Sequence, residues 1–319
     1  MSTIAVLDTT YADTAIEREA AASWSVAVDD RRVEGHVTAH DGVLVQYATI
    51  DGEFFERHPS VRVVGRYGVG VDTIDLDAAS ARGIAVYNVP DYCVREVATH
   101  ATTLALASIR RIRGADALVR SGRWHDWATL RPIPDLSELT LGLLGVGHIG
   151  RETGRLLGPF VRRVIAHDPA GVSGEGLTAV SFDRLLAESD ILSLHCPLLP
   201  ATQHIINAET LSRMRPGAHL INVSRGGLVD AAALASALAS GSLGGAALDV
   251  VDDEPPSPDS PLFSAPNLVI TNHIAWLSES SEPRLRRLLA ERCAAYLAGS
   301  PLTAPLNAAE LVAPERTRP

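Results

Sequence analysis

The sequence predicts an α/β protein built from two domains that each contain a parallel sheet. Short runs of β-branched and leucine residues alternate with alanine- and leucine-rich stretches of helical periodicity, which is typical of parallel strands connected by helices. A glycine motif, G-x-G-x-x-G, lies at residues 145–150 between one such strand and the next helix. Because a complete set of strands and helices precedes this motif, and because 319 residues suit two cores better than one, we expect two Rossmann-like domains.

The expected strands are short and occur along most of the chain. They are recognised by runs of Val, Ile, Leu and Ala that are bounded by polar or turn-forming residues. By residue number, the expected strands are 4–7, 42–46, 61–64, 84–87, 143–145, 164–166, 191–195, 219–223, 246–250 and 268–271.

Two long helical stretches divide the chain. The first is expected as one continuous helix over residues 95–119, and the second covers residues 282–297. The chain then builds most of one domain, crosses to a central domain on the first helix, and returns on the second. We expect residues 1–94 plus 286–319 to form one domain from both chain ends and residues 95–285 to form a doubly wound, nucleotide-binding domain.

Composition excludes several classes of protein. No stretch approaches the ~20 apolar residues that span a bilayer, and the first residues have no basic segment of a secretory signal. The net charge of −10 argues against nucleic acid or an anionic membrane as a partner. The three cysteines have no metal-ligand spacing, so we expect no metal and free thiols in a reducing cytoplasm.

The glycine motif has the context that dinucleotide binding requires. Gly145 allows a tight turn, Gly147 lets a pyrophosphate approach the backbone, and Gly150 lets helix and strand pack closely. The N–H groups at the helix start then meet the phosphates. Asp168 ends the following strand, where a carboxylate accepts hydrogen bonds from ribose hydroxyls and repels a 2′-phosphate. The expected cofactor is therefore NAD rather than NADP.

Three polar residues follow later strands of the same domain: Arg225, Glu254 and His273. Beside a nicotinamide, hydride transfer to a 2-oxo acid places negative charge on a carbonyl oxygen that must receive a proton. His273 can donate that proton, and can accept it in the reverse direction. Glu254 would favour the imidazolium form and fix the ring, and Arg225 can hold the substrate carboxylate with its forked guanidinium.

Each of these residues also has a structural alternative. Arg225 could form a surface ion pair, and His273 could be a structural histidine at a strand end. Glu254 lies in an acidic, proline-rich loop, VVDDEPPSPDSP, in which a solvated charge is ordinary and Asp253 is a neighbouring carboxylate.

The chain resembles the D-isomer-specific 2-hydroxyacid dehydrogenase family over nearly its whole length. The motifs that carry the resemblance are VGRYGVGVDTIDLDAASARGIAVYNVPD, SDILSLHCPLLPATQHIIN, RMRPGAHLINVSRGGLVD, GGAALDVVDDEPP and NLVITNHIAW. The resemblance implies a flavodoxin-like catalytic domain from the two chain ends, a central NAD domain, a cleft between them, and a homodimer joined through the NAD domains. It also implies a small anionic 2-oxo or 2-hydroxy acid as substrate.

The resemblance also implies individual contacts. Asp249 and the backbone around Val223 would meet the nicotinamide amide, and Pro197 would lie over the cofactor. His195 has a structural role as its alternative. The expected cofactor contacts are Gly145, Gly147, His148, Ile149, Gly150, Asp168, His195, Pro197, Thr202, Val223, Ser224, Asp249 and Thr103, and the expected substrate contacts are Tyr47, Arg66, Gly68, Val69, Gly70, Arg225 and Trp276.

Two positions depart from the common family pattern. Asn272 precedes His273 where the family commonly has proline, and Trp276 stands where many members have glycine. Trp276 and Tyr47 resemble the branch that contains the C-terminal-binding-protein corepressors, and an indole here predicts a larger or more apolar substrate side chain than that of glyoxylate. Arg66 favours the opposite interpretation, a substrate phosphate as in the phosphoglycerate dehydrogenase-like members.

Two further classes of function remain open at this point. One is a corepressor-like NAD(H) sensor that keeps the site but turns over little, which the Arg–Glu–His set disfavours. The other is different chemistry on the same fold, such as phosphite oxidation. Formate oxidation is disfavoured because the family's formate oxidisers have glutamine where Glu254 stands.

Overall fold

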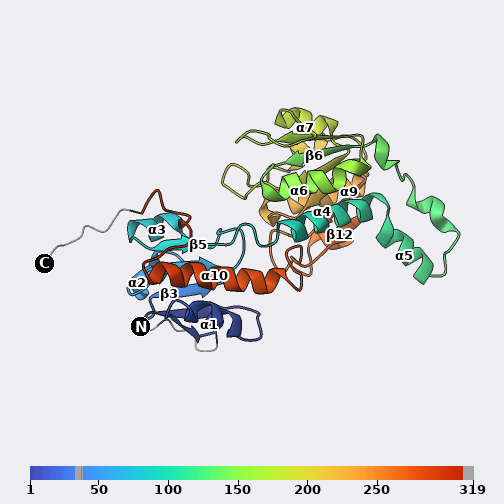
Figure 1. Cartoon of the computed structure of the whole chain (residues 1–319). Coiled ribbons are helices and arrows are strands. Elements are labelled where there is room, and N and C mark those ends of the chain that lie inside the picture. The colour runs from blue at the N-terminus through green and yellow to red at the C-terminus, as the bar shows by residue number, and fades with distance from the viewer. Residues whose placement is uncertain (33–36, 38, 312–319) are drawn as a thin grey trace. The chain divides into compact units, whose positions relative to one another are not determined.

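The computed structural model describes residues 1–32, 37 and 39–311 (Figure 1). The chain divides into two compact units, Met1–Tyr92 with Ser278–Pro319, and Cys93–Leu277. The first unit is thus assembled from both chain ends, and the second unit is formed by the continuous segment between them in the sequence. The predicted division between residues 285 and 286 falls inside the helix α10 (Ser281–Leu297), which belongs as a whole to the first unit.

The first unit contains a five-stranded sheet in which every pairing is parallel. The strand order is β2-β1-β3-β4-β5, which is the flavodoxin-like order that the sequence predicted. The strands are β1 (Thr3–Asp8), β2 (Ala27–Asp30), β3 (Gly42–Val45), β4 (Val63–Arg66) and β5 (Ala85–Tyr87).

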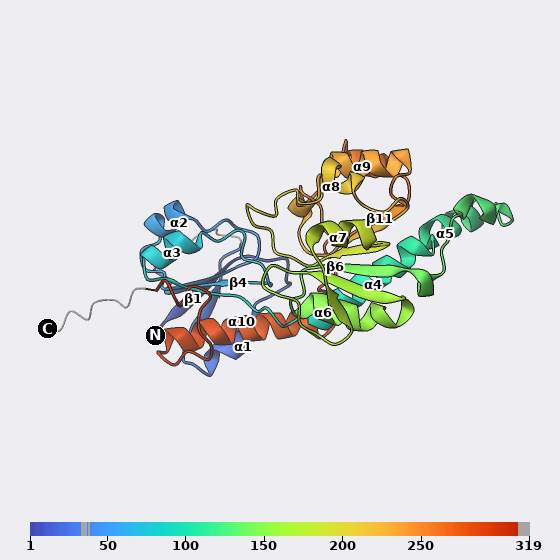
Figure 2. The same cartoon turned by 90° about the horizontal axis from the view of Figure 1, so that it is seen from above.

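Helices cover both faces of this sheet (Figure 2). On one face, α1 (Ala15–Ala22) packs against α10. The other face carries α2 (Gly52–Arg57) and α3 (Leu76–Ala81), whose first turns are capped by Asp51 and Asp75 side chains.

The second unit contains a seven-stranded parallel sheet in the order β12-β11-β10-β9-β6-β7-β8. Read from β6, this is the doubly wound dinucleotide-binding order with one more strand at the β12 edge. The strands are β6 (Thr140–Leu144), β7 (Arg163–His167), β8 (Leu177–Ala179), β9 (Ile191–Leu194), β10 (His219–Asn222), β11 (Gly245–Leu248) and β12 (Leu268–Ile270). The α/β class predicted from the sequence is confirmed.

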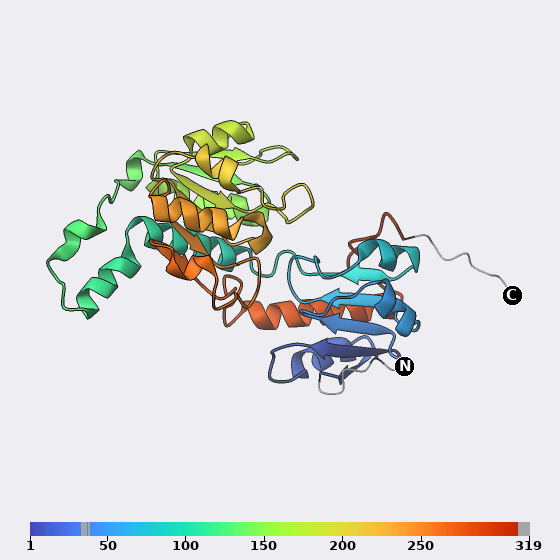
Figure 3. The same cartoon turned by 180° about the vertical axis from the view of Figure 1, so that it is seen from behind.

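Two layers of helices enclose this sheet. One layer contains α4 (Val94–Ile109) and α6 (His148–Leu157), which pack against each other. The opposite layer contains α7 (Phe182–Glu188), α8 (Ala208–Ser212) and α9 (Ala231–Ser240). Figure 3 shows α9 over the sheet from this side.

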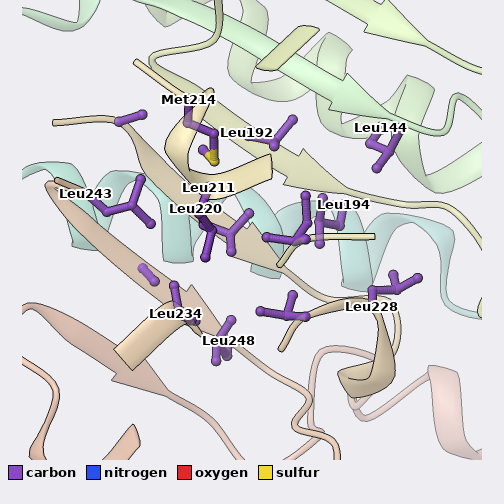
Figure 4. Packing of buried hydrophobic residues seen from close by; sticks show 14 of the residues in the cluster. Leu144, Leu192, Leu194, Leu211, Met214, Leu220, Leu228, Leu234, Leu243 and Leu248 are labelled. Atoms are coloured by element: carbon purple, nitrogen blue, oxygen red, sulfur yellow. The ribbon is translucent and has the colours of Figure 1, made fainter. Parts of the chain in front are cut away.

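The core of the second unit lies between its sheet and the layer of α7, α8 and α9. Leu192, Leu220 and Leu248 come from β9, β10 and β11, and Leu234 meets them from α9 (Figure 4). The exposed fraction of each of these side chains is 2% or less. Because these strands are buried on both faces, they are mostly apolar and do not alternate with polar residues, which is the pattern that made them predictable.

The prediction of one continuous helix over residues 95–119 was wrong. The helix ends at Ile109, Arg111 takes a left-handed backbone (φ 56°), and a second helix, α5 (Ile112–Arg120), begins after it. The Arg111 guanidinium donates to the Gly244 carbonyl at 2.7 Å, which fixes the bend. Since the sequence has no glycine or proline at residues 109–112, local propensity gave no sign of this break.

The strands β2 and β8 were also not predicted. Each is the outermost strand at one edge of its sheet. Their sequences, AVDD and LTA, are short and partly polar because one side of an edge strand faces solvent.

A buried ion pair links α1 to α10 within the first unit. Glu17 receives two hydrogen bonds from Arg286, each 2.8 Å long, and the two side chains are 1% and 6% exposed. The Tyr67 hydroxyl donates to the same carboxylate at 3.0 Å, and the Arg286 guanidinium stacks over the Tyr11 ring at 4.6 Å. Both charges are therefore fully engaged, which is the condition for a tolerable buried pair.

Removing one partner should be strongly destabilising. We expect Arg286→Met to lower the free energy of unfolding by about 3–5 kcal/mol, because Glu17 would remain buried and unpaired. Urea denaturation followed by circular dichroism measures this change. As the control, Arg287→Met removes a neighbouring exposed pair with Glu19 (3.5 Å) and should cost less than about 1 kcal/mol. Equal losses in the two variants would contradict the assignment.

Candidate active site

The predicted acid–base residues come together at one edge of the seven-stranded sheet. Arg225, Glu254 and His273 follow β10, β11 and β12, which are neighbours, and the carboxyl ends of parallel strands lie at the same edge. His273 Nδ1 lies 2.7 Å from Glu254 Oε2. This pair has the geometry of an imidazole oriented by a carboxylate, and its other ring nitrogen, Nε2, is left for chemistry.

Glu254 is held in its charged form. Burial on its own raises the carboxyl pKa, but the hydrogen bond and charge of His273, together with the Val251 N–H and the charge of Arg225, lower it below its ordinary value overall. The Val251 N–H donates to Oε1 at 3.2 Å, so each carboxylate oxygen has a separate partner. The neighbouring Asp253, which sequence reasoning could not separate from Glu254, makes no such bond to His273 in the structure.

The Arg225 loop and the Glu254 loop are in backbone contact. A Cβ built on Gly226 would lie 1.9 Å from the Val251 carbonyl, so only glycine allows the two segments to approach this closely. Asn222, fully buried at the end of β10, shapes the turn: its amide donates to the Arg225 carbonyl at 2.8 Å and its oxygen accepts from the Ser224 N–H at 3.0 Å. The backbone at Arg225 is thereby fixed beside the loop that carries Glu254.

His273 itself has an unusual backbone. Its φ of 58° lies in the left-handed region, which costs non-glycine residues about 1–3 kcal/mol and is maintained only where surrounding contacts enforce it. Its N–H donates to the Asp249 carbonyl at 2.8 Å. The Asp249 carboxylate accepts from the N–H groups of Ile274 (3.0 Å) and Ala275 (2.9 Å). Asp249 therefore forms the template on which the His273 loop is folded.

Two side chains also meet the Asp249 carboxylate. The Thr271 hydroxyl donates to Oδ1 at 2.5 Å, and His100 Nε2 on α4 lies 3.5 Å from Oδ1 and 3.1 Å from the Thr271 hydroxyl. Burial raises the Asp249 pKa, but the bonds from His100, Thr271 and the backbone outweigh it and set the pKa to about 2. The predicted contact between Asp249 and a nicotinamide amide remains untested, and in this structure its carboxylate is already occupied by the loop.

The glycine loop has the geometry of a phosphate cradle. Gly145 has a φ of 91°, and a Cβ there would lie 2.7 Å from the Cys196 nitrogen. A Cβ on Gly150 would lie 2.3 Å from the Gly145 carbonyl oxygen, whereas a Cβ on Gly147 meets nothing within 4 Å. The space at Gly147 adjoins the start of α6, so backbone, space and helix N-terminus all fit the pyrophosphate of a dinucleotide.

Asp168 lies beside this loop, as predicted. Its Oδ2 accepts from the Val146 N–H at 2.8 Å, inside the glycine motif, and its Oδ1 accepts from the Ala170 N–H at 2.9 Å. The carboxylate is half-buried and so retains an accessible edge for ribose hydroxyls.

The other predicted cofactor residues differ in what they do. His195 lies beneath the glycine loop, its Nε2 pairs with Ser193 Oγ at 2.9 Å, and burial lowers its pKa to about 4, so its imidazole is neutral at pH 7. Thr202 donates to the Pro197 carbonyl at 2.8 Å and closes that turn. Ser224 Oγ donates to the Cys196 carbonyl, and the neighbouring Val223 is buried. His148 and Ile149 form the first turn of α6. Thr103 is exposed on α4, and its hydroxyl donates to the Thr99 carbonyl.

The predicted substrate residues of the first unit lie at the carboxyl edge of its own sheet. Tyr47 follows β3 and Arg66 ends β4. Gly68 has a φ of 134°, and a Cβ on it would lie 1.8 Å from Arg66 Nη1, so the guanidinium lies directly against Gly68. Val69 anchors that loop because its carbonyl accepts from the Asn88 amide.

Several positioning residues had escaped the sequence reasoning. Asp8 accepts from the N–H groups of Gln46 (2.8 Å), Tyr47 (2.6 Å) and Ala48 (2.5 Å), and so fixes the Tyr47 turn. Asn222, Thr271 and His100 act in the same way around the second unit's site. In the sequence, each of these residues is recognisable only as a polar residue at a strand end or on a helix. That pattern does not show which group the side chain will bind.

Among residues 1–32, 37 and 39–311, no three His, Cys, Asp or Glu side chains gather as a metal-binding group. Within that same part of the chain, no helix has the length and apolar character needed to cross a membrane.

Residues 102–275 match the family described as "D-isomer specific 2-hydroxyacid dehydrogenase, NAD binding domain". The chain belongs to the D-isomer specific 2-hydroxyacid dehydrogenase family. The family and the central dinucleotide-binding domain predicted from the motifs are therefore confirmed.

Individual relatives extend this similarity beyond the NAD binding domain. D-3-phosphoglycerate dehydrogenase of Mycobacterium leprae is 37% identical over 86% of this chain, which spans only 53% of that relative's length. Hydroxypyruvate reductase of Blautia hydrogenotrophica is 34% identical over 86% of this chain and 87% of its own length. The crystal structure of an NADPH-dependent glyoxylate/hydroxypyruvate reductase from Sinorhizobium meliloti, in complex with citrate, is 30% identical, covers 97% of this chain and 99% of that one, and has a TM-score of 0.83.

The glycine loop offers a matched test of dinucleotide binding. We expect Gly147→Ala to fold like the wild type, because its Cβ would enter open space, but to bind NADH at least about tenfold more weakly, because that space suits the pyrophosphate. Thermal unfolding and NADH fluorescence titration measure the two properties.

Gly241→Ala supplies the control. This residue also has open space at the Cβ position but lies away from the loop, at the end of α9, so NADH affinity should be unchanged even if its positive φ costs stability. Wild-type NADH affinity in Gly147→Ala would contradict the placement of the pyrophosphate.

Proposed function

We propose that this protein is an NAD-dependent oxidoreductase that interconverts a 2-oxo acid and the corresponding D-2-hydroxy acid. The observation that carries the proposal is the 2.7 Å pair of His273 Nδ1 and Glu254 Oε2, with the Arg225 loop in backbone contact with the Glu254 loop. A general acid and a carboxylate-binding cation are the two groups that reduction of a 2-oxo acid demands from the protein.

The residues divide the work as follows in the direction of reduction. The Arg225 guanidinium binds the substrate carboxylate and polarises the C2 carbonyl. The hydride for C2 would come from reduced NAD, which the glycine loop and Asp168 would hold. His273 Nε2 gives its proton to the carbonyl oxygen as negative charge develops there, and Glu254 stabilises the imidazolium before transfer. Reversal of these steps makes His273 the base that accepts the hydroxyl proton of the D-2-hydroxy acid.

NAD is the proposed cofactor rather than NADP. The family's domain binds NAD, and some relatives use NADPH, as the Sinorhizobium meliloti reductase does by its description. In this chain the support for NAD is Asp168, whose carboxylate adjoins the glycine loop and would repel a ribose 2′-phosphate.

The proposed substrate is a small anionic 2-oxo acid. In the first unit, the Gly68–Gly70 loop and Arg66 are proposed to supply further contacts to it, and Arg66 suits a second anionic group. Tyr47, which is 62% exposed, and Trp276 instead suit an apolar side chain. Hydroxypyruvate, phosphohydroxypyruvate and an aromatic 2-oxo acid therefore span the range to be compared.

A homodimer through the NAD-binding unit is also proposed, and the structure offers a specific surface for it. We define the arm as residues 112–135, which contain α5 and project from the second unit (Figures 1 and 3). No residue of α5 is buried, and large apolar side chains are exposed along the arm: Ile112 (56%), Val119 (51%), Trp124 (70%) and Trp127 (58%). Several large apolar side chains exposed on one segment are typical of association surfaces.

A cytoplasmic location is proposed as well. Cys93, Cys196 and Cys293 are free and buried, which suits a reducing compartment. Burial raises the Cys196 pKa to about 11, so this thiol stays protonated and unreactive near neutral pH.

The decisive experiment follows NADH absorbance while glyoxylate, hydroxypyruvate, phosphohydroxypyruvate and phenylpyruvate are offered, with NADPH in parallel. We expect one or more to turn over, with NADH preferred. His273→Asn should lower kcat by about 10²–10⁴-fold, and Glu254→Gln by about ten- to a hundredfold because one charge-assisted hydrogen bond is lost.

Asp253→Asn is the matched control for Glu254→Gln. It removes an adjacent exposed carboxylate from the same loop and should leave kcat at the wild-type value. Tight NADH binding without turnover of any 2-oxo acid would instead favour an NAD(H) sensor. Turnover that survives His273→Asn would refute the assignment of the acid.

The arm can be tested by light scattering coupled to size-exclusion chromatography. We expect the wild type to be a dimer and Ile112→Asp/Trp127→Asp to be a monomer, because charges would replace the apolar side chains of the arm. Phe263→Asp, which changes an equally exposed apolar residue (56%) elsewhere in the same unit, should remain dimeric. A dimer in all three proteins would exclude the arm as the interface.

A further inference from the structure

Three of the four polar atoms of His273 have partners among the described residues. The backbone N–H donates to the Asp249 carbonyl at 2.8 Å, and Nδ1 pairs with Glu254. The remaining group, the His273 carbonyl, accepts a hydrogen bond from Trp276 Nε1 at 3.0 Å. The left-handed backbone at His273 is thus held from both of its peptide groups.

Two residues hold this turn through different groups. Asp249 accepts from the N–H groups of residues 273, 274 and 275, on both sides of the His273 Cα, through its carbonyl and carboxylate. On the carboxyl side, the chain turns with the Leu277 N–H on the Ile274 carbonyl at 2.9 Å, and this turn carries the Trp276 side chain back toward His273. All three Asp249 bonds engage N–H groups of this segment, whereas the His273 carbonyl is held by the indole N–H of Trp276.

We propose that Trp276 is a positioning residue for His273, whose indole N–H fixes the strained turn and so keeps the imidazole aligned on Glu254. This inference rests on the proposed function, in which His273 is the acid–base group. It differs from the role of Trp276 as an apolar wall beside the substrate, because a wall changes discrimination between substrate side chains, whereas alignment of the acid affects every substrate alike.

Trp276→Phe separates these two roles. Phenylalanine keeps a large aromatic side chain but has no N–H group to donate to the His273 carbonyl. The matched control is Trp24→Phe, the same substitution in the loop after α1 of the first unit. Both variants are compared with wild type in the 2-oxo acid panel, with ordinary NADH and with NADH deuterated at the transferred position.

We expect kcat in Trp276→Phe to fall about fivefold for every accepted substrate, the value of one neutral hydrogen bond, with KM values unchanged. The deuterium isotope effect on kcat should rise, because the combined hydride and proton transfer becomes more rate-limiting. A loss of folded protein alone would lower the apparent kcat without changing the isotope effect.

Amide hydrogen exchange provides a readout that does not depend on turnover. Exchange of the amides of residues 273–275 should become about fivefold faster in Trp276→Phe and remain unchanged in Trp24→Phe. If the wild type turns over no 2-oxo acid, the proposed function fails, but hydrogen exchange still decides whether the indole fixes the turn. Unchanged exchange, or an effect on KM that varies with the substrate side chain, would overturn the proposal.

Discussion

The buried carboxylate of Asp249 is the interaction on which the candidate site depends. Its two oxygens and its carbonyl organise the backbone of residues 273–275, and its exposed fraction is 1%. A buried, ionised carboxylate is tolerable only when its oxygens have partners. Here the Thr271 hydroxyl and two backbone N–H groups donate to Asp249, and the His100 imidazole lies 3.5 Å away. His273 can then keep its left-handed backbone after β12, and its imidazole stays paired with the Glu254 carboxylate.

Close backbone contacts position the other parts of the candidate site. The loops after β10 and β11 approach so closely at Gly226 that the arginine and the acid are set by main-chain geometry. The glycine motif follows the same logic, because Gly145 and Gly150 bring strand, helix and the turn after β9 together and leave space at Gly147. In both places short parallel strands supply the rigid frame, and glycines determine how closely the connecting loops can meet.

The sequence predicted those features that depend on local spacing or on chemical necessity. The glycine motif, Asp168 beside it and the approach of His273 to Glu254 belong to this group, as do strands that are buried on both faces. It did not predict features created by long-range contacts: the left-handed Arg111 that divides α4 from α5, the edge strands β2 and β8, and the pairing of Glu17 with Arg286. Asp249 shows the difference well, because family resemblance suggested a ligand contact, whereas the partners of its carboxylate are backbone groups 25 or 26 positions away.

Asp168 bears on any attempt to exchange one nicotinamide cofactor for the other in this scaffold. The usual route would replace this carboxylate with a small or basic residue so that a 2′-phosphate can enter. Here the same side chain accepts the Val146 N–H, so its removal would also leave a donor of the phosphate-binding turn without its acceptor. Redesign toward the phosphorylated cofactor therefore needs an uncharged acceptor at position 168, such as asparagine or serine, with the new positive charge introduced from a neighbouring position.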